Sequence, residues 1–550
     1  MFVRTRKRDN GTTQVQIVEN YRQGAKVVQR LVRSVGHAAS ERELAQFMAI
    51  AEAAIVELKN QKAPVLSFQD PYEVHAPKRK GASKESCEDE VKVKNIRHEK
   101  SINDGYRELF GEVYSAMGLD EVLETERKTD HWNSLLRDLS IARIAEPDSK
   151  LQTHRMLRDE QEISYGLDSV YDLMDHVVEN SDRIKAKVCQ STTELFENKV
   201  DVLFYDVTTL YFESTERDDL RNFGFSKDCK FKEVQVVLAL ITTTDGLPLS
   251  YKLFPGNTNE GKTLIPTIIE MKKEFDLNRV VMAADRAMFT EENLAELDKN
   301  NVRYVVAAKL KGMSKKQQKE ILNAANYALL KNRNEQIWVG EFEHKGRRLI
   351  SALSYKRAEK DAKDRQRLID RLQKKTKDGQ VKINDIIPNH GTKRYLKIID
   401  GKAEVNQEKI EQDALWDGMH GVITNDRDSS AAEILSWYHG LWQIEEAFRV
   451  NKHTLEMRPI YHWTKERIEA HILICFIAFA VLKQTLVRLK RKNLDISGKE
   501  LIYQLKTVQL HRILDIATGK RYLVPSTLNN HQKKIFTLLG IKRSTEPRPC

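Results

Sequence analysis

The stretch from residue 200 to residue 310 limits the fold more than any other part of the chain, because short apolar segments replace the helical spacing that precedes it. Three segments with strand character come first, and two helix–strand pairs follow them. In order, the segments are the strands 202–206, 234–243 and 247–254, the helix 261–275, the strand 279–284, the helix 291–299 and the strand 303–309. This β-β-β-α-β-α-β order predicts a mixed α/β sheet.

Acidic residues follow two of these strands. Asp206 ends the first strand, and Asp285 directly follows the fourth. Ligand sites form at the carboxyl ends of strands in open α/β sheets, so the two carboxylates are candidates for a shared site. Taken alone, an aspartate at a strand end more often forms an Asx turn or caps the next element.

A third acid lies on a predicted helix nearer the C-terminal end. Residues 430–433 have the form of a capping box, so we expect a helix to start there and to continue through residue 452. At about 100° per residue, the directions of Tyr438, Leu441, Glu445 and Lys452 fall within about 60° of one another. One face therefore carries a carboxylate flanked by a phenol and an amine. We hypothesise that Glu445 is a metal ligand whose partners lie far upstream.

Three carboxylates that converge on one point repel one another unless cations neutralise them. Hard oxygen ligands on rigid elements suit Mg²⁺. Two such ions, about 3.5–4 Å apart, activate a water or a 3′-hydroxyl for attack on a phosphodiester and stabilise the leaving oxygen. Asp206, Asp285 and Glu445 together therefore predict metal-dependent phosphodiester chemistry.

The composition favours a protein with a polyanionic partner. The chain has 550 residues, of which 40% are hydrophobic and 31% are charged, and its formal net charge is +11. A uniformly basic surface would give the same net charge, so charge alone does not select nucleic acid. Five scattered cysteines without a CxxC pair argue against a thiolate zinc site and suit a reducing compartment. The N-terminus has no apolar signal region and the apolar run 470–482 is too short to span a bilayer, so we expect a cytoplasmic protein with no membrane partner.

Spacing and composition divide the chain into seven regions. They are 1–60, an N-terminal β-hairpin around Asp9-Asn-Gly11 and a helix; 61–103, a polar linker; 104–199, a helical region; 200–310, the first part of a catalytic core; 311–419, an insertion with extended segments; 420–490, the second part of the core with the Glu445 helix; and 491–550, a C-terminal helical region. The region 104–199 leaves two alternatives open, a helix-turn-helix reader of DNA or a structural bundle that covers a sheet.

Several of these segments resemble bacterial DDE transposases of insertion sequences, in the insertion-sequence-four superfamily with its ribonuclease-H-like core. The likeness covers about residues 200–489 and the N-terminal hairpin. It is carried by the Asp206 strand, the stretch 224–257, the sequence AADRAM around Asp285 and the Tyr438 helix. The superfamily has a Tyr-x2-Arg-x3-Glu-x6-Lys signature, and this chain keeps Tyr438, Glu445 and Lys452 at that spacing.

The resemblance implies a ribonuclease-H-like mixed sheet interrupted by an insertion, in which Asp206, Asp285 and Glu445 form the DDE triad and hold Mg²⁺ or Mn²⁺ in its place. It implies a transposase that binds terminal inverted repeats, cleaves DNA at the element ends and joins the 3′-OH ends to target DNA. The partners are double-stranded DNA and, in the synaptic complex, a second copy of the chain. The bacterial protein is expected in the cytoplasm, associated with the nucleoid when bound to DNA. A nuclease without strand transfer and a DNA-binding protein derived from a decayed transposase are the alternatives.

The chain departs from the signature at Leu441, which stands where the family has an arginine. In the family, the tyrosine, the arginine and the lysine contact the phosphate backbone near the transposon end, and leucine cannot make that bidentate contact. Arg449, two turns further along, is either a substitute or an ordinary surface residue. Trp416 either stabilises a flipped base, as a tryptophan of the insertion does in some relatives, or packs in the core. The predicted DNA contacts are Tyr438, Lys452, Arg449 and Trp416.

Overall fold

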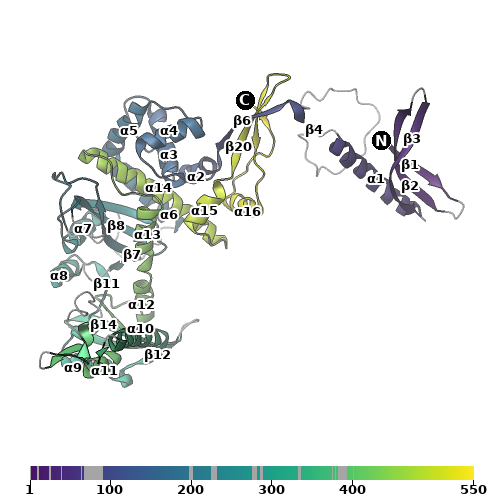
Figure 1. The fold of residues 1–550 in the computed structure, drawn as a ribbon. Coiled ribbons are helices and arrows are strands. Elements are labelled where there is room, and N and C mark those ends of the chain that lie inside the picture. Colours follow the sequence, from purple (N-terminus) through teal and green to yellow (C-terminus); the bar gives the residue numbers. More distant parts are fainter. Residues whose placement is uncertain are drawn as a thin grey trace. The chain divides into compact units, whose positions relative to one another are not determined.

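Figure 1 shows the fold of the protein in a computed structural model. The structure describes residues 2–8, 12–23, 26–38, 40–62, 65–66, 91–196, 202–224, 232–274, 281–284, 289–331, 336–374, 376–377, 380–381, 393–399 and 402–550. The chain divides into two compact units. Unit 1 comprises Met1–Asp104, Thr507–Asn530 and Lys542–Cys550, and unit 2 comprises Gly105–Lys506 and His531–Ile541.

Unit 1 begins with a three-stranded antiparallel sheet that packs against a helix. Its elements are β1 (Phe2–Lys7), β2 (Thr13–Gln23), β3 (Lys26–Ala38) and α1 (Glu41–Lys62). The antiparallel pairing of β1 with β2 confirms the predicted hairpin, although its turn at Asp9-Asn-Gly11 lies outside the described residues. Val15 and Ile17 on β2 pack against Ala51 and Ile55 on α1, so apolar burial holds the helix on this sheet.

Unit 1 also contains a four-stranded sheet built from both ends of the chain. β6 (Ile96–Asn103) pairs with β20 (Gln509–Asp515), β20 with β21 (Arg521–Pro525), and β21 with β22 (Arg548–Pro549). β4 (Val65–Leu66) pairs separately with β5 (Val91–Lys92). The predictions of a polar linker over 61–103 and of a C-terminal helical region over 491–550 did not include these strands, although the second region does contain helices. β6 has the mostly polar sequence IRHEKSIN, and its ladder partners Ser101 and His511 are 410 residues apart, so no local apolar pattern marks it.

The core of unit 2 is a mixed sheet. Among the described residues, nine strands follow the order β12-β13-β14-β19-β11-β10-β7-β8-β9. The elements of the predicted core are β7 (Val202–Tyr211), β8 (Gln235–Thr243), β9 (Pro248–Pro255), α7 (Leu264–Glu274), β10 (Val281–Ala284), α8 (Glu291–Lys299) and β11 (Arg303–Ala307). β10 is parallel to β7 and β11, whereas β8 is antiparallel to β7 and β9. The predicted mixed α/β sheet and its β-β-β-α-β-α-β order are confirmed.

The region 311–419 extends this sheet. The added strands are β12 (Ala328–Lys331), β13 (Gln336–His344) and β14 (Arg347–Ser354), and β14 pairs with β19 (Met419–Thr424), the neighbour of β11. The remaining elements are α9 (Lys315–Leu322), α10 (Tyr355–Lys374), α11 (Gln407–Ala414) and a second sheet of β15 (Thr376–Lys377), β16 (Gln380–Val381), β17 (Leu396–Ile399) and β18 (Lys402–Val405). The predicted insertion is therefore in part a continuation of the core sheet.

Helices that precede the sheet strands in the sequence and helices that follow them form a bundle in unit 2 (Figure 1). They are α2 (Gly105–Ala116), α3 (Thr129–Ala145), α4 (Lys150–Glu160), α5 (Leu167–Glu179), α6 (Ser181–Leu195), α14 (Lys465–Arg491), α15 (Gly498–Leu505) and α16 (Asn530–Leu539). α14 contacts α2, α3, α5 and α6, and α6 also packs against β9. This is the arrangement of a bundle that covers a sheet, one of the two alternatives for residues 104–199.

α14 extends beyond both ends of the apolar run 470–482, which the sequence predicts to be too short to span a bilayer. By length and composition it could cross a membrane, but 89% of its most apolar window is buried inside the protein. Buried residues occupy nearly every position from Ile468 to Leu489. An apolar surface on all sides is what a helix needs at the centre of a bundle, and α14 holds that place.

Candidate active site

Asp206 lies in the middle of β7 rather than at a strand end. The strand continues to Tyr211, and Asp206 pairs with Leu240 on β8. The predicted strand end is wrong because residues 207–211 resume the buried pattern and β8 pairs with all of them. On the other side of β7, the last described pair of the parallel ladder with β10 is Tyr205↔Ala284. Asp206 directly follows that pair on β7.

The side chain of Asp206 shares one face of β7 with Phe204. Because side chains alternate along a strand, Leu203, Tyr205 and Val207 point to the opposite face, where they pack with residues of α7 and α8. Asp206 is half-buried, and its Oδ1 accepts a hydrogen bond from the backbone N–H of the next residue at 2.7 Å. Asp285 follows the last residue of β10 in the sequence and lies outside the described residues.

A buried tyrosine supports the strand from the opposite face. The Tyr205 hydroxyl donates a hydrogen bond to Oγ1 of Thr263 at 2.8 Å, and the Thr263 hydroxyl donates to the Glu260 carbonyl at 2.6 Å. Burial raises the pKa of Tyr205, so its hydroxyl keeps the proton that it donates. This chain of hydrogen bonds fixes the backbone immediately before Asp206.

The predicted Glu445 helix starts as expected and then breaks. α12 (Ala431–His439) begins after Ser430, whose side chain accepts from the Glu433 N–H while the Glu433 carboxylate accepts from the Ser430 N–H at 2.9 Å. The predicted capping box is confirmed. α12 ends at Gly440, and α13 (Trp442–His453) follows it (Figure 1). A single helix through residue 452 is therefore wrong, because i→i+3 hydrogen bonds replace the i→i+4 ladder at this turn, as from Gln443 N–H to the Gly440 carbonyl at 3.0 Å.

Close approach to β7 explains the break. A Cβ atom on Gly440 would lie 2.6 Å from Cζ of Phe204, closer than real Cβ contacts come. α12 contacts β10 and β11, and α13 contacts β7. Because Phe204 and Asp206 share a face, the α12–α13 pair covers the face of the sheet that carries Asp206. Glu445, in the first turn of α13, belongs to this layer.

The break divides the predicted functional face. Tyr438 belongs to α12, whereas Glu445 and Lys452 belong to α13, so only the latter two share an uninterrupted helix. Seven residues apart, they differ in direction by about 20°. Glu445 is exposed, Tyr438 and Lys452 are half-buried, and Leu441, the N-cap residue of α13, is also half-buried. The carboxylate of Glu445 is therefore open to solvent on the helix face that also carries Lys452.

The other two predicted DNA contacts already have partners in the structure. Arg449 is exposed, and its Nε donates to Oε2 of Glu446 at 2.6 Å. Trp416 is half-buried and packs against an apolar cluster that contains Leu310 and Leu349. Core packing, one of the two alternatives for Trp416, describes its position.

The donor set fits a hard divalent cation. Asp206 and Glu445 carry carboxylate oxygens, the ligands that such a cation prefers, on a strand and a helix that contact each other. Across the residues that the structure describes, no group of three His, Cys, Asp or Glu side chains is arranged to hold a metal ion, and the third predicted ligand, Asp285, is outside that set.

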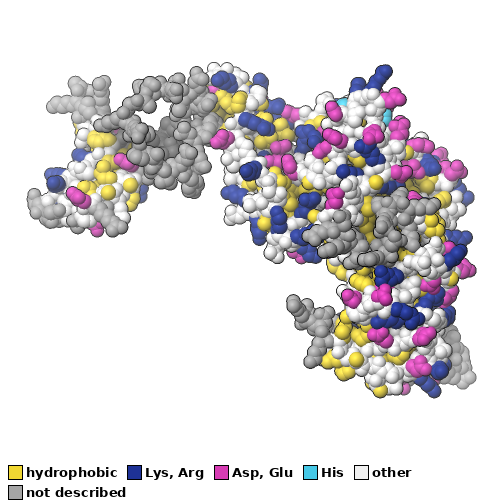
Figure 2. Space-filling view, turned by 180° about the vertical axis from the view of Figure 1, so that it is seen from behind, with side chains coloured by type: hydrophobic (Ala, Val, Ile, Leu, Met, Phe, Trp, Pro, Cys, Tyr) yellow, Lys and Arg dark blue, Asp and Glu magenta, His cyan; other side chains and the backbone are white. Residues whose placement is uncertain are grey.

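The sequence prediction missed a basic cavity near the end of β7. Part of its wall is the run RPIYHWTKER at 458–467, in which basic and aromatic residues alternate. Such interleaving is typical of nucleic-acid contacts and was the available signal. Elsewhere the charges are mixed, and Figure 2 shows Lys and Arg side chains interspersed with Asp and Glu over the visible face.

Comparison with known protein families shows which class of protein the chain belongs to. Residues 198–481 match the family described as the transposase DDE domain, a match that spans more than half of the chain and includes β7 and α13. Residues 2–64 match the N-terminal domain of IS1634 family transposases. The chain belongs to the DDE-domain transposases of insertion sequences.

One solved structure is a more distant comparison. It is described as "Mos1 transposase paired-end complex with left transposon end" and is 13% identical in sequence, with a TM-score of 0.14. The alignment covers 33% of this chain and 59% of that chain. No curated protein matches the chain.

Proposed function

We propose that the protein binds the terminal inverted repeats of its insertion sequence, cleaves DNA at the element ends and transfers the 3′-OH ends to target DNA. The family match supports this reaction class. The observation that carries the site assignment is the approach of Gly440 to Phe204, which lays the Glu445 helix over the Asp206 face of the sheet. The protein acts in the bacterial cytoplasm, associated with the nucleoid when it is bound to DNA.

Asp206, Asp285 and Glu445 would hold Mg²⁺, with Mn²⁺ as a substitute. Bound Mg²⁺ supplies activation of the attacking oxygen and stabilisation of the leaving oxygen. Asp206 contributes a carboxylate fixed on the central sheet, and Glu445 contributes one that is exposed to the substrate. Water breaks the first phosphodiester and leaves a 3′-OH, which then displaces a 3′-oxygen in the target strand. Each step exchanges one P–O bond for another, so no covalent link between protein and DNA is required.

Tyr438 and Lys452 would contact the phosphates next to the cleaved end. Their phenol and ammonium groups flank Glu445 in sequence, and Leu441 between them supplies no charge. Arg449 would contribute by exchanging Glu446 for a phosphate, and Trp416 would have to leave its apolar cluster to contact a base. Two element ends must be held together for joining, so a homodimer is proposed for the synaptic complex.

A joining assay tests the proposal. Purified protein is incubated with a labelled terminal repeat, a target plasmid and Mg²⁺, and joined products are expected. Nicks without joining would indicate a nuclease, and DNA binding without nicks would indicate a decayed transposase. Flanking DNA gives an independent check, because an insertion sequence is bounded by inverted repeats and short direct duplications.

A further inference from the structure

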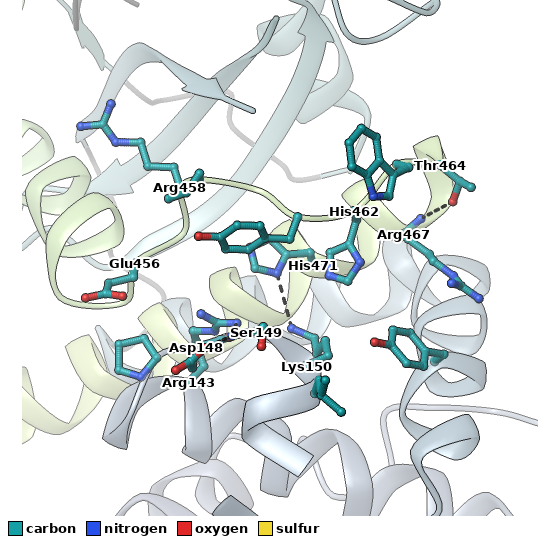
Figure 3. Close-up of a pocket in the computed structure, with 16 residues that line it drawn as sticks. Arg143, Asp148, Ser149, Lys150, Glu456, Arg458, His462, Thr464, Arg467 and His471 are labelled. Carbon is teal, nitrogen blue, oxygen red and sulfur yellow. Dashed lines mark hydrogen bonds between the residues drawn. The ribbon is translucent and has the colours of Figure 1, made fainter. Parts of the chain in front are cut away.

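A cavity in unit 2 lies where the segment between α13 and α14 passes the start of α4 (Figure 3). Its volume is about 560 Å³. Ligand pockets of about 300–1,000 Å³ hold small organic molecules, so this cavity has room for one nucleotide. The wall is formed by residues 143 and 147–151, Tyr171 on α5, residues 456, 458–459 and 461–464, and Arg467 and His471 on α14.

Positive charge dominates the wall. The cations are Arg143, Lys150, Arg458 and Arg467, and the acids are Asp148 and Glu456, so four cations face two carboxylates. Burial lowers the pKa of His462 to about 3 and holds the pKa of His471 well below its usual range, so both imidazoles are neutral at pH 7. Burial lowers the pKa of Lys150 to about 7, so at pH 7 the wall carries an excess of between one and two positive charges.

Lys150 is the most unusual of these cations because it is only 4% exposed. Its Nζ lies 3.4 Å from Nδ1 of His471 (Figure 3). Nε2 of that histidine lies 3.2 Å from the Met457 carbonyl. These contacts assign the proton to Nε2, so Nδ1 accepts from Lys150. Across the described residues, no carboxylate forms an ion pair with Lys150 or Arg467. Burying a cation without a carboxylate is costly, and a bound anion would offset that cost.

The guanidinium groups are held in place by aromatic rings. Arg458 lies 5.3 Å from the ring centroid of Tyr211, and Arg467 lies 5.1 Å from that of Tyr171. A cation over the face of an aromatic ring is attracted by the ring, and a guanidinium in that position still has planar N–H donors for an oxyanion. Phosphate is the anion whose oxygens match such planar donors best.

Two exposed aromatic side chains stand beside these cations. Tyr461 is 59% exposed and Trp463 is 57% exposed, and both line the cavity. The guanidinium of Arg221 lies 5.8 Å from the Trp463 ring and supports it from one side. Aromatic faces beside a cationic groove are the features on which unpaired bases stack.

The cavity is close to the strand that carries the active-site aspartate. Phe212, directly after β7, forms a bridge with Ile460, and the Ile460 N–H donates to the Tyr211 carbonyl. Five residues separate Asp206 from Tyr211, which corresponds to about 17 Å of strand. DNA bound at Asp206 would cover that distance in about five base pairs.

We propose that this cavity binds one unpaired nucleotide of the DNA substrate, with the phosphate on Lys150 and Arg467 and the base against Trp463 and Tyr461. A base inside a duplex cannot present its face to Trp463, so the nucleotide must be single-stranded or extruded. The inference rests on the proposed function, because the DNA at the cavity is the DNA that is held at Asp206.

Binding of a tailed duplex to the full chain tests the inference. Fluorescence anisotropy without divalent metal compares a blunt duplex with the same duplex carrying a five-nucleotide single-stranded tail. The wild-type protein is expected to bind the tailed duplex on the order of tenfold more tightly, the contribution of about one stacked base. Trp463→Ala should remove this preference, and Trp463→Phe should keep most of it.

Trp442→Ala is the matched control, because Trp442 is also 57% exposed and does not line the cavity. It should leave the tail preference intact. Arg467→Gln should reduce the salt slope for the tailed duplex by about 0.7, as expected when one contact to a single-stranded phosphate is lost. Inorganic phosphate is a second probe, and competition by phosphate with no preference for the tail would overturn the nucleotide assignment.

The outcomes separate the two proposals. If neither duplex binds, the proposed function is at fault. If the blunt duplex binds but the tail adds nothing, or if Trp463→Ala keeps the preference, the cavity does not hold an unpaired nucleotide.

Discussion

The proposed active-site face and the basic cavity are both built from segments far apart in the sequence, but they are stabilised in opposite ways. At the active-site face, Gly440 packs on fully buried Phe204, and the carboxylate of Glu445 remains in solvent. At the cavity, the charged group itself is buried, because Lys150 lies beneath the surface against His471. Apolar packing positions the first site without cost, whereas the second site reduces the stability of the fold that contains it.

Replacing Glu445 should produce the largest functional effect. Glu445→Gln keeps the shape of the side chain but removes the charge that the metal requires, so we expect cleavage to fall at least about 10³-fold. DNA binding should change little, since the lost group faces the metal. Labelled terminal repeats measure both quantities. Glu446→Gln, one residue along α13, is the control and should retain cleavage; an active Glu445→Gln protein would remove this residue from the site.

Replacing Lys150 should stabilise the protein. Burial lowers the pKa of Lys150 from 10.5 to about 7, and the nearby Arg143 guanidinium contributes in the same direction. At pH 7 the unfolded chain binds this proton more tightly than the folded chain, so Lys150→Met should add on the order of 3–4 kcal/mol to the free energy of unfolding. The same variant should weaken binding of the tailed duplex.

The stabilisation by Lys150→Met should become smaller as the pH rises. Between pH 7 and pH 9.5 the unfolded state holds the Lys150 proton and the folded state loses it, so wild-type stability rises through this window. The advantage of Lys150→Met should shrink by about 2–3 kcal/mol, which melting temperatures at the two pH values measure. A constant difference would mean that Lys150 does not titrate in the folded protein.

Adding a methyl group at Gly440 should destabilise the active-site layer. In an ordinary helix Gly→Ala stabilises by about 1 kcal/mol, but here the new Cβ meets Phe204, so Gly440→Ala should cost about 1–3 kcal/mol. Phe204→Leu in the same chain should recover part of the loss. Thermal unfolding of the two single variants and the double variant measures the coupling, and additive effects would argue against the contact.

Restoring the family's arginine should have the smallest effect. Leu441→Arg places a cation between Tyr438 and Lys452, so binding of terminal repeats should tighten and the salt slope should steepen by about 0.9, the value for one phosphate contact. Titrations at several salt concentrations measure the slope. An unchanged slope would mean that position 441 does not face phosphate.

The sequence predicts features that depend on local spacing and misses features that depend on contacts between distant segments. The strand order and the capping box at Ser430 follow from local periodicity and spacing, and the structure confirms both. The break at Gly440 does not, because Phe204, 236 residues upstream, imposes it. The continuation of β7 past Asp206 likewise depends on pairing with β8.

The burial of Lys150 was equally beyond prediction. Nothing in the sequence around it distinguishes Lys150 from a solvated lysine, and its environment arises when α4 meets His471 on α14. Local sequence predicts elements and exposed charges, whereas close approaches and buried charges depend on contacts between distant segments.

Mapping the metal position tests the central claim most directly, that Asp206, Asp285 and Glu445 share one metal site. Fe²⁺ in place of Mg²⁺ generates hydroxyl radicals in the presence of ascorbate and peroxide, and these cut the nearby backbone. We predict cuts around residues 206, 285 and 445 that excess Mg²⁺ suppresses and that Glu445→Gln weakens at all three positions. Cuts near residues 206 and 285 with none near 445, unaffected by Glu445→Gln, would contradict the claim.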